Sequence, residues 1–125
     1  MESESYFFKK GFVNLLAYKE SFPIISKTIV LLNSAPQEHL YLLTDTKLKL
    51  LSILSNLANG YNEFDKKKKV EFYKSARNSL SSAQSNFLFF IDLNIFEKAI
   101  VIEQINNLDG CLKYINSIIK KMDKK

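Results

Sequence analysis

Four runs of apolar residues at helical spacing, separated by short polar breaks, are the feature that most constrains this chain. They cover about residues 11–33, 37–59, 66–90 and 95–119. Apolar residues that recur every three or four positions line one face of a helix. Short connections make consecutive helices antiparallel. The chain is long enough for one domain and too short for two. We therefore expect an all-α fold, an up-down-up-down antiparallel four-helix bundle that takes up residues 1–125 as a single domain.

The spacing within three of the runs predicts which residues form the core. In the second run they are Leu40, Leu43, Leu50, Leu54 and Leu57; in the third, Val70, Tyr73, Leu80, Ala83 and Phe87; in the fourth, Ile95, Ala99, Ile102, Ile105, Leu108, Leu112, Ile115 and Ile119. The first run is apolar all round, which indicates cover on more than one side. Apolar residues also exceed one stripe in the fourth run, at Phe96, Ile100, Val101 and Ile118. This surplus predicts a homo-oligomer in which the first and fourth helices, or their neighbours, pack between subunits; a thick seam inside one broad bundle is the alternative.

Several residues predict where the helices begin and end. Pro23 lies inside the first run, so we expect either a kink there or a separate helix that starts at Pro23. Gly60 marks the turn before the third helix. Asn94 and Glu97 have the spacing of a capping pair for the fourth helix. We expect residues 1–10 to form an N-terminal tail that need not be ordered, and residues 121–125 to form a basic C-terminal tail.

The charge of the chain is concentrated in one stretch. Residues 47–77 contain eight basic and three acidic side chains, so this stretch alone accounts for the net charge of +5. Four consecutive lysines, residues 66–69, follow Asp65, which we expect to be an N-cap. Each cation in the first turn of a helix is unfavourable by roughly 0.3–1 kcal/mol at low salt. Local helix stability therefore does not explain these lysines, whereas phosphate binding would. The alternative is a solvated turn that keeps the protein soluble.

The basic stretch supplies the candidate contacts to nucleic acid, which we expect to bind phosphates rather than to read bases. The candidates are Lys47, Lys49, Lys66, Lys67, Lys68, Lys69, Lys74 and Arg77. Tyr61, Phe64 and Phe72 lie beside these cations, where they could stack on unpaired bases or could seal the bundle end or a subunit contact. The lysines that end the fourth helix lie where cations complement the helix dipole, and they indicate little about function. They are Lys120, Lys121, Lys124 and Lys125.

No catalytic or metal-binding pattern is present in the sequence, so we expect no enzyme activity and no cofactor. The chain has no Gly-rich phosphate loop, a single histidine, His39, and a single cysteine, Cys111. We expect His39 to pack or cap in its turn, and Cys111 to be a small buried apolar residue. The N-terminus is acidic rather than basic, and the apolar run at residues 24–32 is far too short to span a membrane. These features predict a cytoplasmic protein without a membrane partner.

Two segments resemble known families. The turn from Pro36 to Asp45 has the form Pro-x-acid-His-x-aromatic-x-Leu-x-Asp, which is similar to a turn in the accessory variability determinant proteins of diversity-generating retroelements. The segment 52–61, Ser-Ile-Leu-Ser-Asn-Leu-Ala-Asn-Gly-Tyr, resembles the signature of the related rRNA intervening-sequence four-helix proteins, and residues 76–80 continue this likeness. The resemblance covers about residues 15–120. Asn59 and Ser82 stand where the intervening-sequence proteins usually have glutamate, so the branch stays open.

The resemblance implies a four-helix protomer that assembles into a homopentameric barrel with a basic surface or channel. In the retroelement branch, such a barrel binds nucleic acid and a reverse transcriptase and supports cDNA synthesis during mutagenic retrohoming. The hypothesis is therefore a non-enzymatic, nucleic-acid-binding accessory protein. The alternatives are an intervening-sequence-type four-helix protein and an oligomeric protein-interaction scaffold.

Overall fold

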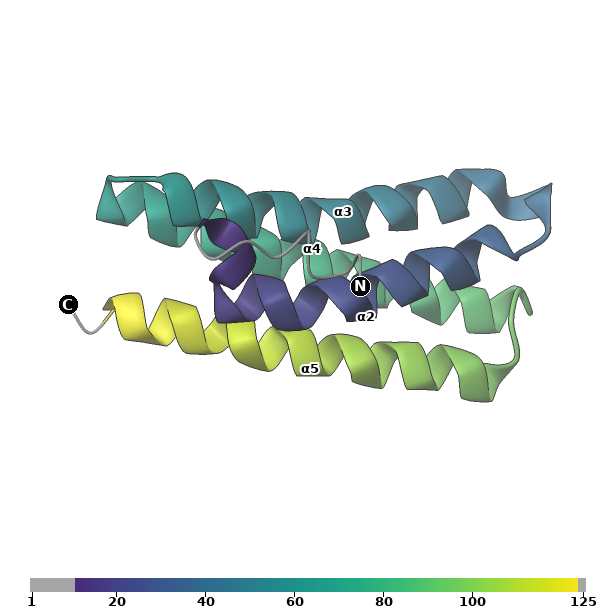
Figure 1. The fold of residues 1–125 in the computed structure, drawn as a ribbon. Coiled ribbons are helices and arrows are strands. Elements are labelled where there is room, and N and C mark those ends of the chain that lie inside the picture. Colours follow the sequence, from purple (N-terminus) through teal and green to yellow (C-terminus); the bar gives the residue numbers. More distant parts are fainter. Residues whose placement is uncertain (1–10, 124–125) are drawn as a thin grey trace, which may run out of the picture.

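The computed structural model describes residues 11–123, which form four long helices and no strand (Figure 1). A short 3-10 turn, η1 (Phe12–Asn14), precedes α2 (Leu16–Asn33); a second, η2 (Gln37–His39), precedes α3 (Leu40–Asn62); α4 (Lys66–Asp92) and α5 (Lys98–Asp123) follow. The all-α, four-helix prediction is confirmed. The prediction of a tail at residues 1–10 lies outside the described residues. Residues 121–123, expected in a basic tail, belong to α5 instead. Within residues 11–123, no helix is both long enough and apolar enough to cross a membrane.

Each helix runs antiparallel to the one before it (Figure 1). α2 packs against α3 and α5, and α4 packs against the same two helices, so the four form a closed ring around one core. This order brings the end of α3, the start of α4 and the end of α5 together at one end of the bundle. The start of α3, the end of α4 and the start of α5 meet at the other end.

The core of α3 and α4 follows the predicted spacing. The predicted residues Leu43, Leu50, Leu54 and Leu57 of α3 and Tyr73, Leu80, Ala83 and Phe87 of α4 are buried, together with Ile53, Ala76 and Phe90. The prediction is wrong at Leu40, which is 50% exposed because it stands at the first position of α3, outside the bundle seam. It is also wrong at Val70, which is only half-buried and lines a surface hollow. α2 contributes a narrow stripe of small and branched residues: Ala17, Ser21, Ile25, Thr28 and Leu32.

The core register of α5 differs from the predicted one in its first turns. Ala99 and Ile102 are exposed, whereas Val101, which was counted as surplus, is completely buried. Both Val101 and Ile102 are one helical turn before Ile105, so spacing alone does not choose between them. The buried stripe continues as Leu108, Cys111, Ile115 and Ile119. Much of the apolar surplus of α5 is therefore absorbed by the bundle, because Phe96 and Ile118 also pack against the core.

The turn between α4 and α5 shows why Asn94 is not the predicted N-cap. Its φ angle is 56°, in the left-handed region, and the backbone N–H groups of Asn94 and Ile95 donate to the carbonyls of Ile91 and Phe90. This pattern is a Schellman motif that ends α4. The carbonyl of Glu97 accepts the first helical bonds of α5, from Ile100 and Val101. Asn94 closes one helix instead of opening the next.

Pro23 does not start a separate helix, so that alternative is wrong. α2 runs from Leu16 to Asn33 with Pro23 inside it. Proline removes one N–H from the helical ladder and would leave the carbonyl four residues earlier, at Lys19, without its partner. Both Pro23 and Lys19 are exposed, so water can satisfy that carbonyl.

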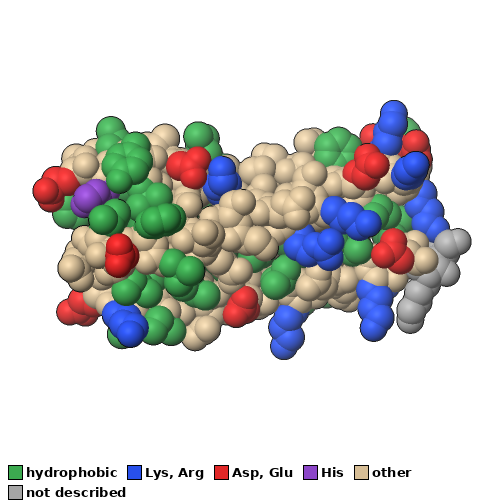
Figure 2. Space-filling model, turned by 180° about the vertical axis from the view of Figure 1, so that it is seen from behind, with side chains coloured by type: hydrophobic (Ala, Val, Ile, Leu, Met, Phe, Trp, Pro, Cys, Tyr) green, Lys and Arg blue, Asp and Glu red, His purple; other side chains and the backbone are tan. Residues whose placement is uncertain are grey.

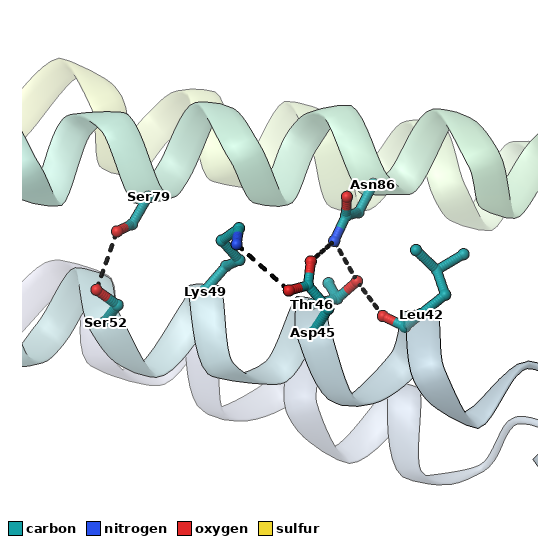
Figure 3. A network of polar contacts seen from close by, with 7 residues as sticks. All are labelled: Leu42, Asp45, Thr46, Lys49, Ser52, Ser79 and Asn86. Atoms are coloured by element: carbon teal, nitrogen blue, oxygen red, sulfur yellow. Dashed lines mark hydrogen bonds and ion pairs between the residues drawn. The ribbon is translucent and has the colours of Figure 1, made fainter.

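Small polar side chains join α3 to α4 (Figure 3). The amide of Asn86 donates to Asp45 at 2.8 Å and to the Thr46 hydroxyl at 3.0 Å, and the Ser79 hydroxyl donates to Ser52 at 3.0 Å. The hydrogen bond from Asn86 is the main cause that lowers the pKa of the Asp45 carboxyl below its ordinary value. The small residues of α4 thus allow α3 of the same chain to approach closely.

Neighbouring leucines of α3 provide a test of the core. Leu50 is completely buried, whereas Leu51 is 49% exposed. Leu50→Ala should lower the free energy of unfolding by about 2–5 kcal/mol, because it removes buried apolar surface and leaves a cavity. Leu51→Ala, the matched control, should cost about 1 kcal/mol or less. Urea denaturation measures both values, and equal losses would contradict the register of α3.

Candidate nucleic-acid interface

The predicted lysine run forms the first turn of α4, at the end of the bundle where α3 and α5 terminate (Figure 1). Asp65 is the N-cap, as predicted, and its Oδ1 accepts a hydrogen bond from the backbone N–H of Lys67 at 3.0 Å. Lys66, Lys67 and Lys68 are exposed. Within residues 11–123, their ammonium groups make no hydrogen bond or ion pair. These three cations are therefore available to an anion.

Lys69 has a structural role that the sequence did not reveal. Its Nζ donates to the carbonyls of Gly60 at 2.7 Å and Tyr61 at 2.9 Å, and lies 5.8 Å and 6.0 Å from the ring centroids of Tyr61 and Tyr73. The last carbonyls of a helix lack partners in the helix itself, and a cation there complements the dipole. Local stability does explain this lysine, because it caps α3, the helix beside its own.

Gly60 allows α3 and α4 to approach at this end. It is not in the turn, as the sequence suggested, but inside α3, and it is buried. A Cβ at this position would lie 2.5 Å from Cε1 and 2.8 Å from Cδ1 of the Tyr73 ring. Tyr73 is only 2% exposed, so the ring has little room to move. Glycine is required here by close packing of an aromatic ring, not by a turn.

A hollow of about 610 Å³ lies beside the lysine run, and we call it the basic hollow. Lys66, Lys67 and Lys74 line it from α4, and Met122 and Asp123 line it from α5. Three carboxylates, those of Asp65, Glu71 and Asp123, are part of the same lining. The last turn of α5, with Lys120 and Lys121, reaches the same end of the bundle. These two lysines, judged uninformative from the sequence, add to the positive charge.

Lys74 and Arg77 extend the charge along α4. Lys74 is exposed, and Arg77 follows it after nearly one helical turn. The guanidinium of Arg77 donates to Oδ1 of Asn116 on α5 at 3.2 Å, which leaves other N–H groups free for a ligand. Both residues continue the basic surface from the hollow along the boundary between α4 and α5.

Lys47 and Lys49 are not part of this cluster. Lys47 donates to Oδ1 of Asn33 at 2.6 Å, and Lys49 forms an ion pair with Asp45 at 3.3 Å. Lys49 lies about 20 Å along the helix axis from the end of α3, at a rise of about 1.5 Å per residue. The structure therefore brings together six of the eight predicted residues and separates these two.

The predicted aromatic residues differ in accessibility. Phe64, in the turn between α3 and α4, is fully exposed, Tyr61 is 39% exposed, and Phe72 is half-buried. Burial raises the pKa of Tyr73 above its ordinary value, and the charge of the neighbouring Tyr61 adds to the rise. An exposed phenylalanine and an accessible tyrosine thus flank the free lysines, and a buried tyrosine lies behind them.

The opposite end of the bundle carries many exposed apolar residues, with acidic side chains among them (Figure 2). Figure 2 shows Lys and Arg side chains concentrated on the right half of one face and hydrophobic side chains on the left half. The exposed apolar residues from the elements that meet at that left end are Leu40, Tyr41, Leu88, Phe89, Leu93 and Ile102. The two halves of the molecule therefore differ in the kind of partner they can bind.

The remaining candidate residues have structural roles. Cys111 is free and completely buried, as predicted, and burial raises the pKa of its thiol. The His39 ring packs edge-on against Tyr41, with ring centroids 6.4 Å apart, and its side chain makes no capping hydrogen bond to α3. Among the described residues, no group of three or more potential metal ligands is present.

Searches against models of protein families, curated proteins and solved structures found no match for this chain.

The close contact of Gly60 with Tyr73 predicts opposite effects at two helical glycines. Gly60→Ala should destabilise the protein by about 1–3 kcal/mol, because the added methyl overlaps a buried ring. Gly110→Ala, the control, meets no atom within 4 Å and should stabilise by about 0.5–1 kcal/mol through helix propensity. Chemical denaturation gives both values. The loss at Gly60 should shrink in a Tyr73→Leu background, and an unchanged loss there would assign it to another cause.

The cap on α3 predicts that substitutions of two neighbouring lysines differ in their effect on the stability of the protein. Lys69→Met should lower the unfolding free energy by about 0.5–1.5 kcal/mol, because two carbonyls lose a charged donor. Lys68→Met should leave stability unchanged or raise it by a few tenths of a kcal/mol, because it removes a cation from a helix N-terminus. Denaturation curves at low salt measure both variants. Equal effects would show that Lys69 does not act as a cap.

Proposed function

We propose that this chain is a non-enzymatic nucleic-acid-binding accessory protein. It contacts phosphates with the end of the bundle where α4 begins and α5 ends, which we call the basic end. The observation that supports this most directly is the state of Lys66, Lys67 and Lys68, which are exposed and make no ion pair within residues 11–123. They also lie where the helix dipole opposes them, so their own helix gains nothing from them. A polyanion would compensate both the charge of the lysines and that of the helix N-terminus.

The geometry of the basic end suits the sugar-phosphate backbone of a nucleic acid better than a small anion. Lys74 and Arg77 continue the charge of the lysine run along α4, and Lys120 and Lys121 add to it from α5. Ammonium groups spread along a surface can each replace a condensed counterion of the strand, which gives affinity without base recognition. The three carboxylates that line the basic hollow beside three lysines limit its attraction for a compact anion.

The family resemblance extends this proposal to partners. It implies RNA or DNA in a diversity-generating retroelement, a reverse transcriptase as protein partner, and a homopentamer. Five copies would present five basic ends, and several weak phosphate contacts would then act together. The rRNA intervening-sequence branch is the alternative within the same family group.

A protein-interaction scaffold is the second candidate function, and one observation favours it. Tyr41, Leu48 and Leu51 are 70%, 61% and 49% exposed along the outer side of α3, and Leu88 and Phe89 are exposed near the end of α4. Exposed apolar groups on this scale are typical of surfaces that bind protein, including further copies of the same chain. Binding through them would depend little on salt, whereas phosphate binding would depend on it strongly.

Charge-matched variants test the phosphate contacts. Lys66→Gln/Lys67→Gln should weaken binding to a labelled single strand at low salt, because two fewer phosphates are neutralised. The slope of log affinity against log salt should fall by about 0.7 for each of these phosphates. Fluorescence anisotropy across a salt series measures both quantities, with oligomer mass determined on the same sample.

The control is Lys27→Gln/Lys98→Gln, which removes the same charge from exposed positions distant from the basic end. This variant should keep nearly all of the binding. Equal weakening in the two variants would show that only net charge matters and would contradict a basic-end site. Absence of salt-sensitive binding by the wild-type protein would make the scaffold the better account.

A further inference from the structure

A second hollow at the basic end, which we call the tyrosine pocket, differs from its neighbours in chemistry. It has a volume of about 390 Å³, within the range of small-ligand sites. Tyr61, Tyr73 and Tyr114 line it from three different helices, and Lys69 and Lys121 supply positive charge. No carboxylate is among the described residues that line it, whereas Glu71 lines both the basic hollow and a third hollow beside it. The pocket therefore combines aromatic surface with two cations and no carboxylate among its described lining residues.

The bundle itself holds the Tyr73 ring and the Lys69 ammonium of this pocket in place. Tyr73 forms a buried wall because it packs on Gly60, and Lys69 is fixed between the Tyr61 and Tyr73 rings by its two carbonyl bonds. A lysine ammonium has three donors, so one N–H of Lys69 stays free beside these rings. Lys121 reaches the same pocket from the last turn of α5. Little ordering of side chains would be needed when a ligand binds.

We propose that the tyrosine pocket binds one unpaired nucleotide of a nucleic-acid strand, with its base against the accessible rings of Tyr61 and Tyr114 and its phosphate beside Lys69 and Lys121. This proposal rests on the proposed function, because the rest of that strand would follow the lysines of α4. A flat base suits aromatic walls, and stacking on such a ring contributes about 1–3 kcal/mol for each base. Bases within a duplex are already stacked and paired, so the pocket selects single strands or strand ends. The basic end would thus distinguish unpaired from paired nucleic acid.

The test separates bases from phosphates with two probes of equal charge. One is a thymidine oligonucleotide of about 12 nucleotides, within the length that one small binding domain covers, and the other is an abasic oligomer with the same number of phosphates. The wild-type protein should bind the thymidine strand about 10-fold more tightly, or better, than the abasic one. Tyr61→Leu should remove this preference and leave the affinity for the abasic probe unchanged, whereas Tyr61→Phe should retain the preference.

Two further variants keep the test independent of folding effects. Tyr41→Leu removes an exposed tyrosine at the opposite end and should change neither affinity. Ser117, an exposed residue, lines the pocket, so Ser117→Leu should block the base without touching a core residue. Circular dichroism confirms that each variant is folded. The chain has six tyrosines and no tryptophan, so the quenching of tyrosine fluorescence that is lost in Tyr61→Leu and kept in Tyr41→Leu reports stacking in the pocket.

Failure of this proposal can be told apart from failure of the proposed function. Equal, salt-sensitive binding of the thymidine and abasic probes by the wild-type protein would overturn the pocket and leave the phosphate-binding function in place. No salt-sensitive binding of either probe would overturn both. If an acidic, phenylalanine-containing peptide displaced the thymidine strand more effectively than thymidine monophosphate did, the pocket would belong to a protein partner and the proposal would be wrong.

Discussion

The packing of the Tyr73 ring on Gly60 is the contact on which the arrangement of the lysine run at this end of the bundle depends. It lets α3 and α4 approach until the start of one helix lies beside the end of the other. At that distance Lys69 reaches the free carbonyls of α3, and its neighbours in the same run are left facing solvent. The close approach of the two helices and the phase of α4 thus make one of four identical lysines a cap of α3, whereas the other three have no hydrogen bond or ion pair from their ammonium groups within residues 11–123.

Antiparallel connectivity explains why the lysines and many of the exposed apolar residues gather at opposite ends (Figure 2). The basic start of α4 and the lysines that end α5 must meet, because these helices are neighbours of opposite direction. The apolar residues at the start of α3 and the end of α4 meet at the other end for the same reason. Between the two ends, small side chains such as Ser52 and Ser79 hold α3 to α4 through hydrogen bonds. The bundle therefore presents two unlike surfaces on one rigid body.

The buried residues were predicted correctly where the helical period alone determines them. Predictions failed where a neighbouring helix or turn determines which residue is buried or caps a helix. The buried stripes of α3 and α4 were predicted because the apolar residues between Leu43 and Leu57, and between Tyr73 and Phe87, fall on a single face of a helix with 3.6 residues per turn. Val101 and Ile102 both fit the period of α5, so the choice between them needed the position of the other helices. Asparagine is common both at N-caps and at the left-handed position that ends a helix, so the residue type alone does not choose between them. The backbone of Asn94 is left-handed and ends α4.

The sequence by itself determined the all-α architecture, most of the core and the presence of a basic stretch, because these follow from local spacing and composition. Only the tertiary structure decided which charges act together. It separated Lys47 and Lys49, each held by a partner on α2 or α3, from the lysines of α4. It added Lys121 and gathered Tyr61, Tyr73 and Tyr114 from three helices into one pocket. Residues far apart in the chain become neighbours only through helix packing. Local spacing defines the faces of a single helix, but it does not give the distance between residues on different helices.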